Sequence, residues 1–134
     1  MEIEAKVLES VNRAGRVGVL ATADRTGRPN AAYFGSPRLN QDGTLIMGLM
    51  NNRSLKNLEQ SPLAVFFTVE KAPVDFQTPG WRLYLKVREI QKQGPILDGV
   101  REAIAAKAGK NAAALIQAGV VFEVTEVRPL VDMG

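Results

Sequence analysis

Residues 45–62 read LIMGLMNNRSLKNLEQSP, and this stretch is more informative than any other in the chain. An apolar strand ends in two asparagines, and a short amphipathic helix follows, with Pro62 at its exit. Arg53, Ser54 and Lys56 stand at the opening of this helix, and Ser54 is a suitable N-cap residue. A guanidinium, a hydroxyl and an ammonium beside free helix N–H groups make an anion site, most simply one for a phosphate group. The alternative is a capped surface helix with solvated charges.

The composition limits the chemistry of the chain mainly through what it lacks. The 134 residues include no histidine and no cysteine, which excludes zinc ligation by those residues, thiol catalysis, disulfides and an imidazole base. Any redox chemistry must therefore come from a bound cofactor. The net charge is +3, and the Lys and Arg residues are interspersed with Asp and Glu along the chain. The few aromatic residues are not interleaved with basic ones. This pattern does not favour a nucleic-acid partner.

The length predicts the number of domains, and the N-terminal residues and apolar runs predict the cellular location. At 134 residues, we expect a single domain over residues 1–134, large enough to bury its own core. The opening residues MEIEAK lack the pattern of a signal peptide, and no apolar run approaches the roughly 20 residues that span a bilayer. We therefore expect a cytoplasmic protein without a membrane partner.

Hydrophobic periodicity predicts a mainly β chain with a few helices. Helices are expected at 2–14, 54–60, 94–108 and 111–118. Strands are expected at 17–23, 30–39, 44–50, 63–69, 81–93 and 120–127. The run at 63–69 is nearly continuously apolar, which predicts burial on both faces. Six strands with tight turns indicate a small β-barrel with helices packed on it.

The order of these segments resembles a known family. The resemblance rests on VGVLAT at 17–22, the Asp-Gly turn at 42–43, RSLKNL at 53–58, Ser-Pro at 61–62 and Gly-Pro at 94–95. In this order they resemble the FMN-binding split β-barrel family related to pyridoxamine 5′-phosphate oxidase, and most of all its small stand-alone FMN-binding proteins. The resemblance runs from about residue 3 to 130. It implies a six-stranded split β-barrel with an N-terminal helix, a short helix after the third strand and one or two helices before the last strand.

The resemblance also implies a set of FMN-binding residues. A basic residue and a Ser or Thr before an Asn-Leu helix hold the flavin phosphate in the family, which corresponds to Arg53 and Ser54 here, while Lys56 is offset from the usual lysine. The flavin ring is expected to lie against the ends of the second and third strands, at Tyr33, Phe34, Ser36, Leu49, Met50 and Asn51. The alternative is that Phe34, Leu49 and Met50 are part of the barrel core, which their apolar character also allows. Trp81 either stacks on a flavin across a subunit boundary or belongs to the core or the interface.

Three functions are compatible with the sequence. The first is an FMN-binding redox protein, acting as an electron carrier or as a flavin-dependent reductase or oxidase. The second is a split-barrel binding module for another phosphorylated or haem-like ligand without redox catalysis. The third is a structural or nucleic-acid-interacting barrel. The sequence indicates no catalytic residue and no metal site. The long C-terminal extension of the full oxidase is not found, so pyridoxamine 5′-phosphate oxidase activity is not expected.

The aromatic residues predict a homodimer with FMN at its interface. A small barrel filled by its own side chains has little room left for a ligand, so a cleft completed by a second copy is expected. Aromatic side chains too numerous for one small core are available for such an interface, namely Tyr33, Phe34, Phe66, Trp81 and Tyr84.

Overall fold

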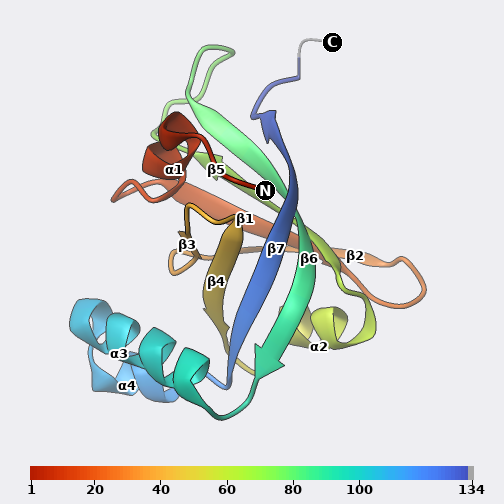
Figure 1. Cartoon of the computed structure of the whole chain (residues 1–134), viewed down its shortest axis with the longest axis vertical. Helices are drawn as coiled ribbons and strands as arrows, with labels where there is room; N and C mark the ends of the chain where they lie inside the picture. Colours follow the sequence, from red (N-terminus) through yellow and green to blue (C-terminus); the bar gives the residue numbers. More distant parts are fainter. Residues whose placement is uncertain (133–134) are drawn as a thin grey trace.

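The computed structural model describes residues 1–132, which form one antiparallel sheet with helices at its edges and on its outer face (Figure 1). The strands are β1 (Val17–Ala23), β2 (Pro29–Tyr33), β3 (Arg38–Leu39), β4 (Thr44–Leu49), β5 (Leu63–Val69), β6 (Gly80–Gln91) and β7 (Ala118–Pro129). The helices are α1 (Ala5–Val11), α2 (Arg53–Gln60), α3 (Pro95–Ala108) and α4 (Lys110–Ala114). The mainly β class and the order of helices and strands expected from the sequence are confirmed.

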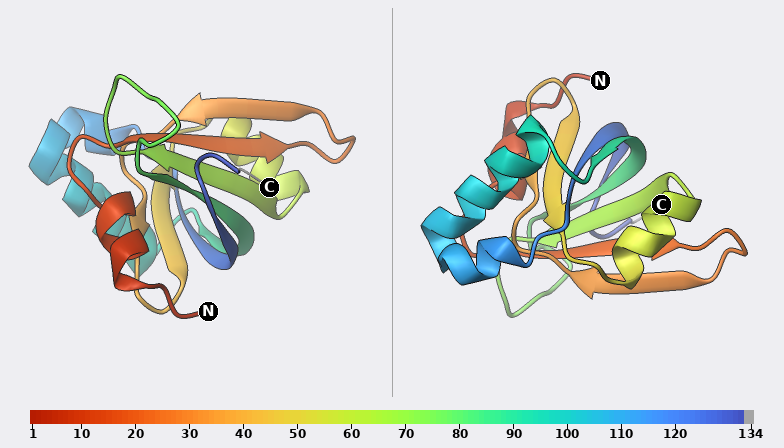
Figure 2. Two further views of the ribbon diagram at one scale, coloured as in Figure 1. Left: turned by 90° about the horizontal axis from the view of Figure 1, so that it is seen from above. Right: turned by 90° about the horizontal axis from the view of Figure 1, so that it is seen from below.

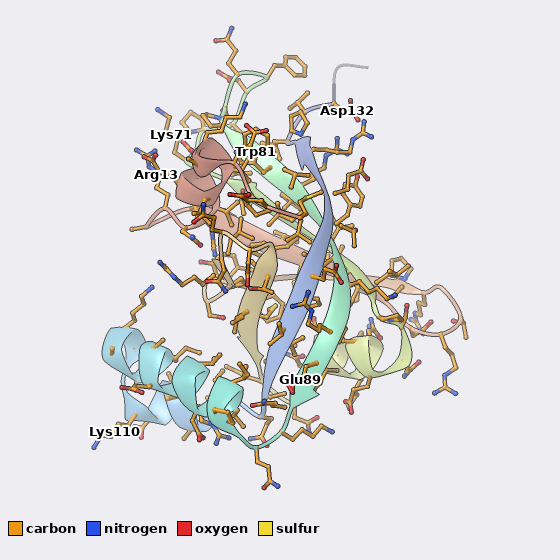
Figure 3. All side chains as sticks on the ribbon, in the orientation of Figure 1. Arg13, Lys71, Trp81, Glu89, Lys110 and Asp132 are labelled. Carbon is orange, nitrogen blue, oxygen red and sulfur yellow. The ribbon has the colours of Figure 1, made fainter. Side chains whose placement is uncertain are left out.

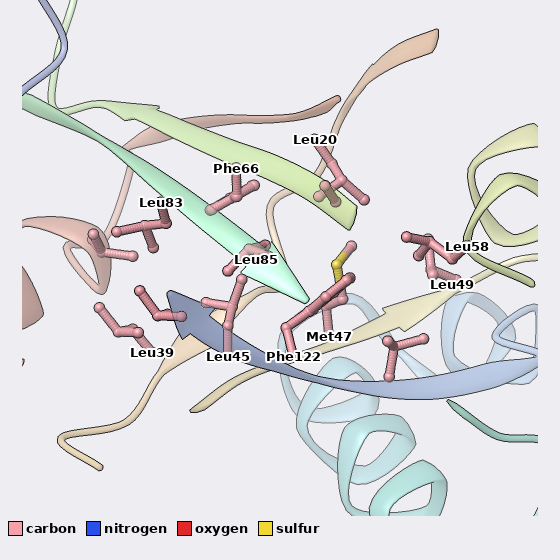
Figure 4. Packing of buried hydrophobic residues seen from close by; sticks show 14 of the residues in the cluster. Leu20, Leu39, Leu45, Met47, Leu49, Leu58, Phe66, Leu83, Leu85 and Phe122 are labelled. Carbon is pink, nitrogen blue, oxygen red and sulfur yellow. The ribbon is translucent and has the colours of Figure 1, made fainter. Parts of the chain in front are cut away.

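The sheet has seven strands in the order β2-β1-β5-β6-β7-β4-β3, and it curls around the hydrophobic core (Figure 2). Its concave face carries the alternating apolar residues of each strand, as period-two patterning requires. Figure 4 shows this core, in which Phe66 and Phe122 are the largest fully buried side chains. Leu55 and Leu58 of α2 close one end of the core, and Val7 and Val11 of α1 belong to the same cluster.

The expectation of six strands is wrong by one, because the strand expected at 30–39 is two strands. The chain leaves the β2 register after Tyr33 and pairs again only at Arg38 and Leu39. Pro37 has no N–H to donate to a ladder. Carbonyls in this break accept hydrogen bonds from the guanidinium of Arg16 instead, which donates to Phe34 O at 3.3 Å and to Pro37 O at 2.8 Å.

Two further expectations need correction. The helix expected at 2–14 covers only Ala5–Val11, because the Asn12 side chain pairs with the backbone of Leu39 through both its amide nitrogen (2.8 Å) and its oxygen (2.9 Å). The strand expected to be buried on both faces, β5, alternates instead, and Leu63 is 63% exposed. No helix among residues 1–132 is long and apolar enough to cross a membrane.

Two glycines let α3 lie directly on the outer face of the sheet. Gly48 of β4 pairs with Gly119 of β7. A Cβ atom at Gly48 would lie 2.6 Å from Val100 Cγ1, and one at Gly119 would lie 3.0 Å from the backbone of Leu97. A Cβ contact of 2.6 Å is essentially never seen and one of 3.0 Å is unusually tight, so the close position of α3 depends on the missing side chains at these two sites, above all at Gly48.

Candidate functional site

The helix predicted to hold a phosphate begins one residue earlier than expected. Asn52 is its N-cap, with its side-chain oxygen accepting from Leu55 N at 3.1 Å. The prediction of Ser54 as N-cap is therefore wrong, since Ser54 is inside the first turn and only 2% exposed. Asn is as good a cap as Ser, so sequence preference alone does not choose between them. The N–H groups of Arg53 and Ser54 precede the first intrahelical bond and have no acceptor within the helix.

One face of α2 is attached to the hairpin formed by β1 and β2. The attachment is polar and uses residues spaced three apart, so that they share one side of the helix. The three hydrogen bonds are Asn30 Nδ2 to Ser54 Oγ (3.5 Å), Asn57 Nδ2 to Thr22 Oγ1 (3.0 Å) and Arg25 N to Gln60 Oε1 (3.2 Å). The N-terminal turn of α2 is thereby held against the start of β2.

A small pocket of about 210 Å³ lies between this hairpin and α2. We call it the basic pocket, because Arg28, Arg53 and Lys56 all line it; its other lining residues are Asp24, Pro29, Asn57 and Gln60. Among residues 1–132, the ion pairs within 4 Å include none formed by Arg53 or Lys56. Both cations are thus available to an anion that enters the pocket.

The one carboxylate of the basic pocket is engaged by its own turn. Asp24 Oδ1 accepts from Thr26 Oγ1 (2.7 Å), Thr26 N (2.9 Å) and Arg28 N (3.0 Å). The hydrogen bond from the Thr26 hydroxyl, followed by the one from the Arg28 N–H, holds the pKa of Asp24 below its ordinary value. The ionised carboxylate therefore shapes the turn that carries Arg28 into the pocket.

The chemistry of the basic pocket fits a phosphoryl group. Two guanidinium groups and an ammonium line it beside the first turn of α2, and each is a stronger donor towards an anion than towards a neutral acceptor. Its volume of about 210 Å³ is below the roughly 300–1,000 Å³ of sites that enclose a whole small molecule. The basic pocket therefore fits the phosphate end of a larger ligand rather than all of it.

The residues expected to contact the flavin ring fall into two groups. Tyr33, which is 64% exposed, and Ser36 line a second cavity of about 650 Å³. Met50 is 44% exposed, and Asn51 is exposed beside the start of α2. The other two belong to the core, which was the alternative for them: Leu49 is fully buried, and Phe34 packs against the same cluster.

Strand β2 connects the two cavities. Pro29, its first residue, lines the basic pocket, and Tyr33, its last, lines the larger cavity. Four residue steps at about 3.3 Å each separate them by about 13 Å. A ligand with its phosphate in the basic pocket and a ring near Tyr33 would therefore extend along this edge strand.

Trp81 lies at the other end of the molecule from α2 within one chain. It pairs with Thr68, whereas Leu63, the β5 residue next to the exit of α2, pairs with Lys86. Trp81 is half-buried against the core, and Lys6 Nζ of α1 lies 5.7 Å from the centre of its ring. Figure 3 shows Trp81 beside α1. A contact between Trp81 and a flavin stays a prediction that requires the partner chain.

The hairpin of β1 and β2 contributes site residues that the sequence pattern did not predict. Arg28 lines the basic pocket, and Asn30 contacts Ser54, but neither was named as a candidate. The available signal was the position of Arg28 at the end of a turn and immediately before a predicted strand. That this turn lies against α2 depends on the pairing of β1 with both β2 and β5, which the sequence does not reveal.

Comparison with solved structures places this architecture among known ones. An FMN-binding protein from Syntrophomonas wolfei aligns with a TM-score of 0.83 at 20% identity, covering 96% of this chain and 86% of that one. A protein from Lactobacillus delbrueckii named for pyridoxamine 5′-phosphate oxidase aligns with a TM-score of 0.68 at 16% identity, over 95% of this chain and 93% of that one. HutZ, the haem storage protein from Vibrio cholerae, aligns with a TM-score of 0.66 at 19% identity, over 96% of this chain and 95% of that one.

These likenesses are ones of fold, since the identities are low. No protein-family model and no curated protein matches the sequence. The alignments nevertheless run over nearly the whole chain, and they agree with the resemblance noted from the order of its sequence motifs. The chain therefore has the split-barrel fold of the FMN-binding proteins related to pyridoxamine 5′-phosphate oxidase.

Proposed function

We propose that this chain is an FMN-binding redox protein, which acts as an electron carrier or as a flavin-dependent reductase or oxidase. The observation that carries the proposal is the basic pocket, where Arg28, Arg53 and Lys56 converge beside the opening of α2. The similarity to an FMN-binding protein of the same fold supports it. When bound, the flavin supplies the redox chemistry, which side chains without His or Cys do not provide.

In this proposal two regions of the chain bind the two ends of FMN. The basic pocket binds the phosphate through Arg28, Arg53 and Lys56. Ser54 is buried in the same turn of α2 and does not line the pocket. The ring lies near Tyr33, Ser36, Met50 and Asn51, which are the expected ring residues that keep exposed surface. Leu49 and Phe34 support this region from the core side, where they pack.

We also propose that the protein is a homodimer with FMN at the subunit boundary. The outer face of β2, β1, β5 and β6 is rich in apolar side chains that a single chain leaves half-buried or exposed. Cross-strand pairing brings these residues into one stripe: Tyr33, Val19 and Phe67 in one row, and Ala31, Ala21, Val65 and Tyr84 in the next. An apolar stripe beside the ligand region is typical of an interface between copies.

Binding of FMN and of riboflavin to the purified protein tests the phosphate assignment. FMN should bind far more tightly, because riboflavin lacks the dianion. Arg53→Ala should weaken FMN binding by about 1.5–3 kcal/mol, or about 10- to 150-fold, and leave riboflavin binding nearly unchanged. Arg25→Ala is the matched control, since Arg25 is an exposed arginine of the same hairpin that does not line the basic pocket. Equal affinities of the wild-type protein for FMN and riboflavin would contradict the assignment.

Haem is the competing ligand in the same experiment. HutZ, a haem storage protein, shares the fold, and the second candidate function is a binding module for a haem-like molecule. A chain without His or Cys would have to ligate haem iron through another side chain, such as the Tyr33 phenol in the larger cavity. Stoichiometric haem binding that Tyr33→Phe abolishes, together with no affinity for FMN, would select this second function.

A further inference from the structure

The larger cavity, here named the α3 cavity, lies between α3 and the segments that flank the start of β1 and the end of β2. Its volume of about 650 Å³ is within the range of small-molecule sites. Its lining residues and those of the basic pocket have no member in common. The two cavities are therefore lined by separate residues, although β2 contributes to both.

The charges that line the α3 cavity are all of one sign. Arg13, Arg16, Arg38 and Lys107 line it, and its lining within residues 1–132 contains no Asp or Glu. Arg13 has an ion-pair partner outside the cavity, Glu70, at 3.5 Å. The other three form no ion pair within 4 Å in the described part of the chain. The cavity therefore carries a positive potential that favours an anion.

Arg16 is the buried member of this set, with only 7% of its surface exposed. Its guanidinium donates to three backbone carbonyls, those of Val11 (2.7 Å), Phe34 (3.3 Å) and Pro37 (2.8 Å). An arginine has five N–H donors, so these three bonds leave part of its donor capacity unused. Carbonyls satisfy donors but do not neutralise a buried charge, which costs free energy unless an opposite charge is nearby.

The opposite wall of the cavity is apolar. Ile96, Val100 and Ile104 of α3 line it, together with Ile46 of β4. All four are only partly buried, so apolar area remains for a ligand to cover. Lys107 lies near the end of the same helix, so cations and aliphatic side chains line one cavity. Such a lining selects a molecule with an anionic end and an apolar body.

We propose that the α3 cavity binds a small carboxylate or sulfonate with an apolar body, with its anionic group towards Arg16 and Arg38 and its apolar body against α3. Tyr33 and Ser36 line this cavity and are also the proposed ring contacts. The molecule is therefore the substrate of the flavin, a role that rests on the proposed function, whereas its binding does not.

Two fluorescent probes of the same shape test the binding step. 1-Anilinonaphthalene-8-sulfonate carries a single sulfonate, and N-phenyl-1-naphthylamine has the same aromatic body without it. The sulfonate probe should bind with one site per chain and about tenfold or more tighter than the neutral probe. In 1 M salt this difference should shrink, because exposed charges are screened. Inorganic phosphate at millimolar concentration should not compete, since it has no apolar body.

Variants of lining residues locate the probe. Arg38→Gln and Lys107→Gln should each weaken sulfonate binding about two- to fivefold, the effect of losing an exposed charge pair, and leave the neutral probe unaffected. Lys110→Gln is the matched control, an exposed lysine that does not line the cavity. Ala103→Asp, which adds a carboxylate to the lining, should weaken sulfonate binding more strongly than Ala106→Asp, which is exposed on α3 outside the lining.

The outcomes separate this proposal from the proposed function. Equal affinity for the two probes, or lining variants that behave like their controls, would overturn the α3 cavity as an anion site even if FMN binds. Sulfonate binding that disappears when the chain dimerises would mean that a second copy fills the cavity, which also overturns it. Sulfonate binding by a wild-type protein that has no affinity for FMN would keep the cavity and overturn only its role as the flavin's substrate site.

Discussion

Asn57 of α2 and Thr22 of β1 form a buried side-chain hydrogen bond, with Asn57 Nδ2 donating to Thr22 Oγ1 at 3.0 Å. Asn57 is 5% exposed and Thr22 is 4% exposed, so both residues are largely removed from water. The bond joins the helix that carries Arg53 and Lys56 to the hairpin that carries Arg28. With the bonds of Ser54 and Gln60 to the same hairpin, it holds the two sides of the basic pocket together.

Breaking this bond should destabilise the fold and weaken FMN binding together. Asn57→Ala leaves the Thr22 hydroxyl buried without its donor, at a cost of about 1–3 kcal/mol in the free energy of unfolding. The double variant Thr22→Val, Asn57→Leu should lose less than the sum of the two single variants, because both polar groups are then removed. Urea unfolding of the wild type, Thr22→Val, Asn57→Leu and the double variant measures the coupling. Additive losses would mean that the bond contributes nothing.

The first turn of α2 offers a sharper test of which residue caps the helix. Asn52→Ala should lower the free energy of unfolding by about 1 kcal/mol, the usual effect of losing a side-chain cap. Ser54→Ala should have a smaller effect, because its hydroxyl only accepts a long hydrogen bond of 3.5 Å from Asn30. A larger loss in the free energy of unfolding for Ser54→Ala than for Asn52→Ala would mean that Ser54 caps the helix.

Local signals in the sequence were sufficient for most of the secondary structure. The β1 and β5 ranges follow directly from apolar runs bounded by turn residues, and α3 begins at Pro95 after Gly94 as expected. The expected strand at 30–39 failed because its interruption depends on Arg16, a residue 18 positions before Phe34. Gly35, Ser36 and Pro37 lie inside the expected strand and are the local signal of its interruption.

Only the part of the candidate site that forms a local pattern could be predicted from the sequence. Arg53 and Lys56 were identified because they lie in one helical turn with a cap, which is a local pattern. Arg28 reaches the same pocket from the hairpin, through long-range pairing. The cations of the α3 cavity come from α1–β1, β3 and α3, so its uniform charge becomes visible only once the chain is folded.

The turn at Asp24 should make stability depend on pH in the acid range. The folded state holds the pKa of Asp24 below its ordinary value, chiefly through the Thr26 hydroxyl. The stabilisation is therefore present above the unfolded pKa of about 3.9 and is lost as the pH falls through the folded pKa. Asp24→Asn keeps an oxygen acceptor and should flatten this acid-side dependence, as should Thr26→Val. Urea midpoints between pH 7 and pH 2.5 measure it, and unchanged slopes in both variants would contradict the assignment.

The proposed dimer should form through the apolar stripe on the outer face. Phe67→Glu places a carboxylate among Val19 and Tyr33 and should convert the protein to a monomer of about 14.5 kDa with weakened FMN binding. Val74→Glu is the matched control, at an apolar residue that is 56% exposed outside the stripe. In the wild type, the melting temperature should rise with both FMN and protein concentration, because ligand binding and association are linked. Sedimentation at micromolar concentration decides the state, and a wild-type monomer that holds stoichiometric FMN would rule out a shared site.

Substitution of two glycines near α3 should have opposite effects on stability. Gly48→Ala places a Cβ 2.6 Å from Val100 Cγ1 and 3.0 Å from Ile116 Cγ2, so α3 must move outwards, at about 1–3 kcal/mol. Gly99→Ala lies within α3, and its Cβ meets nothing within 4 Å, so it should stabilise the helix by about 0.5–1 kcal/mol. Because Val100 lines the α3 cavity, Gly48→Ala should also change the affinity for 1-anilinonaphthalene-8-sulfonate, while FMN binding at the basic pocket stays close to that of the wild type. Thermal unfolding and probe titration of both variants measure these effects. A Gly48→Ala protein as stable as the wild type would mean that α3 does not rest on β4 as closely as the structure has it.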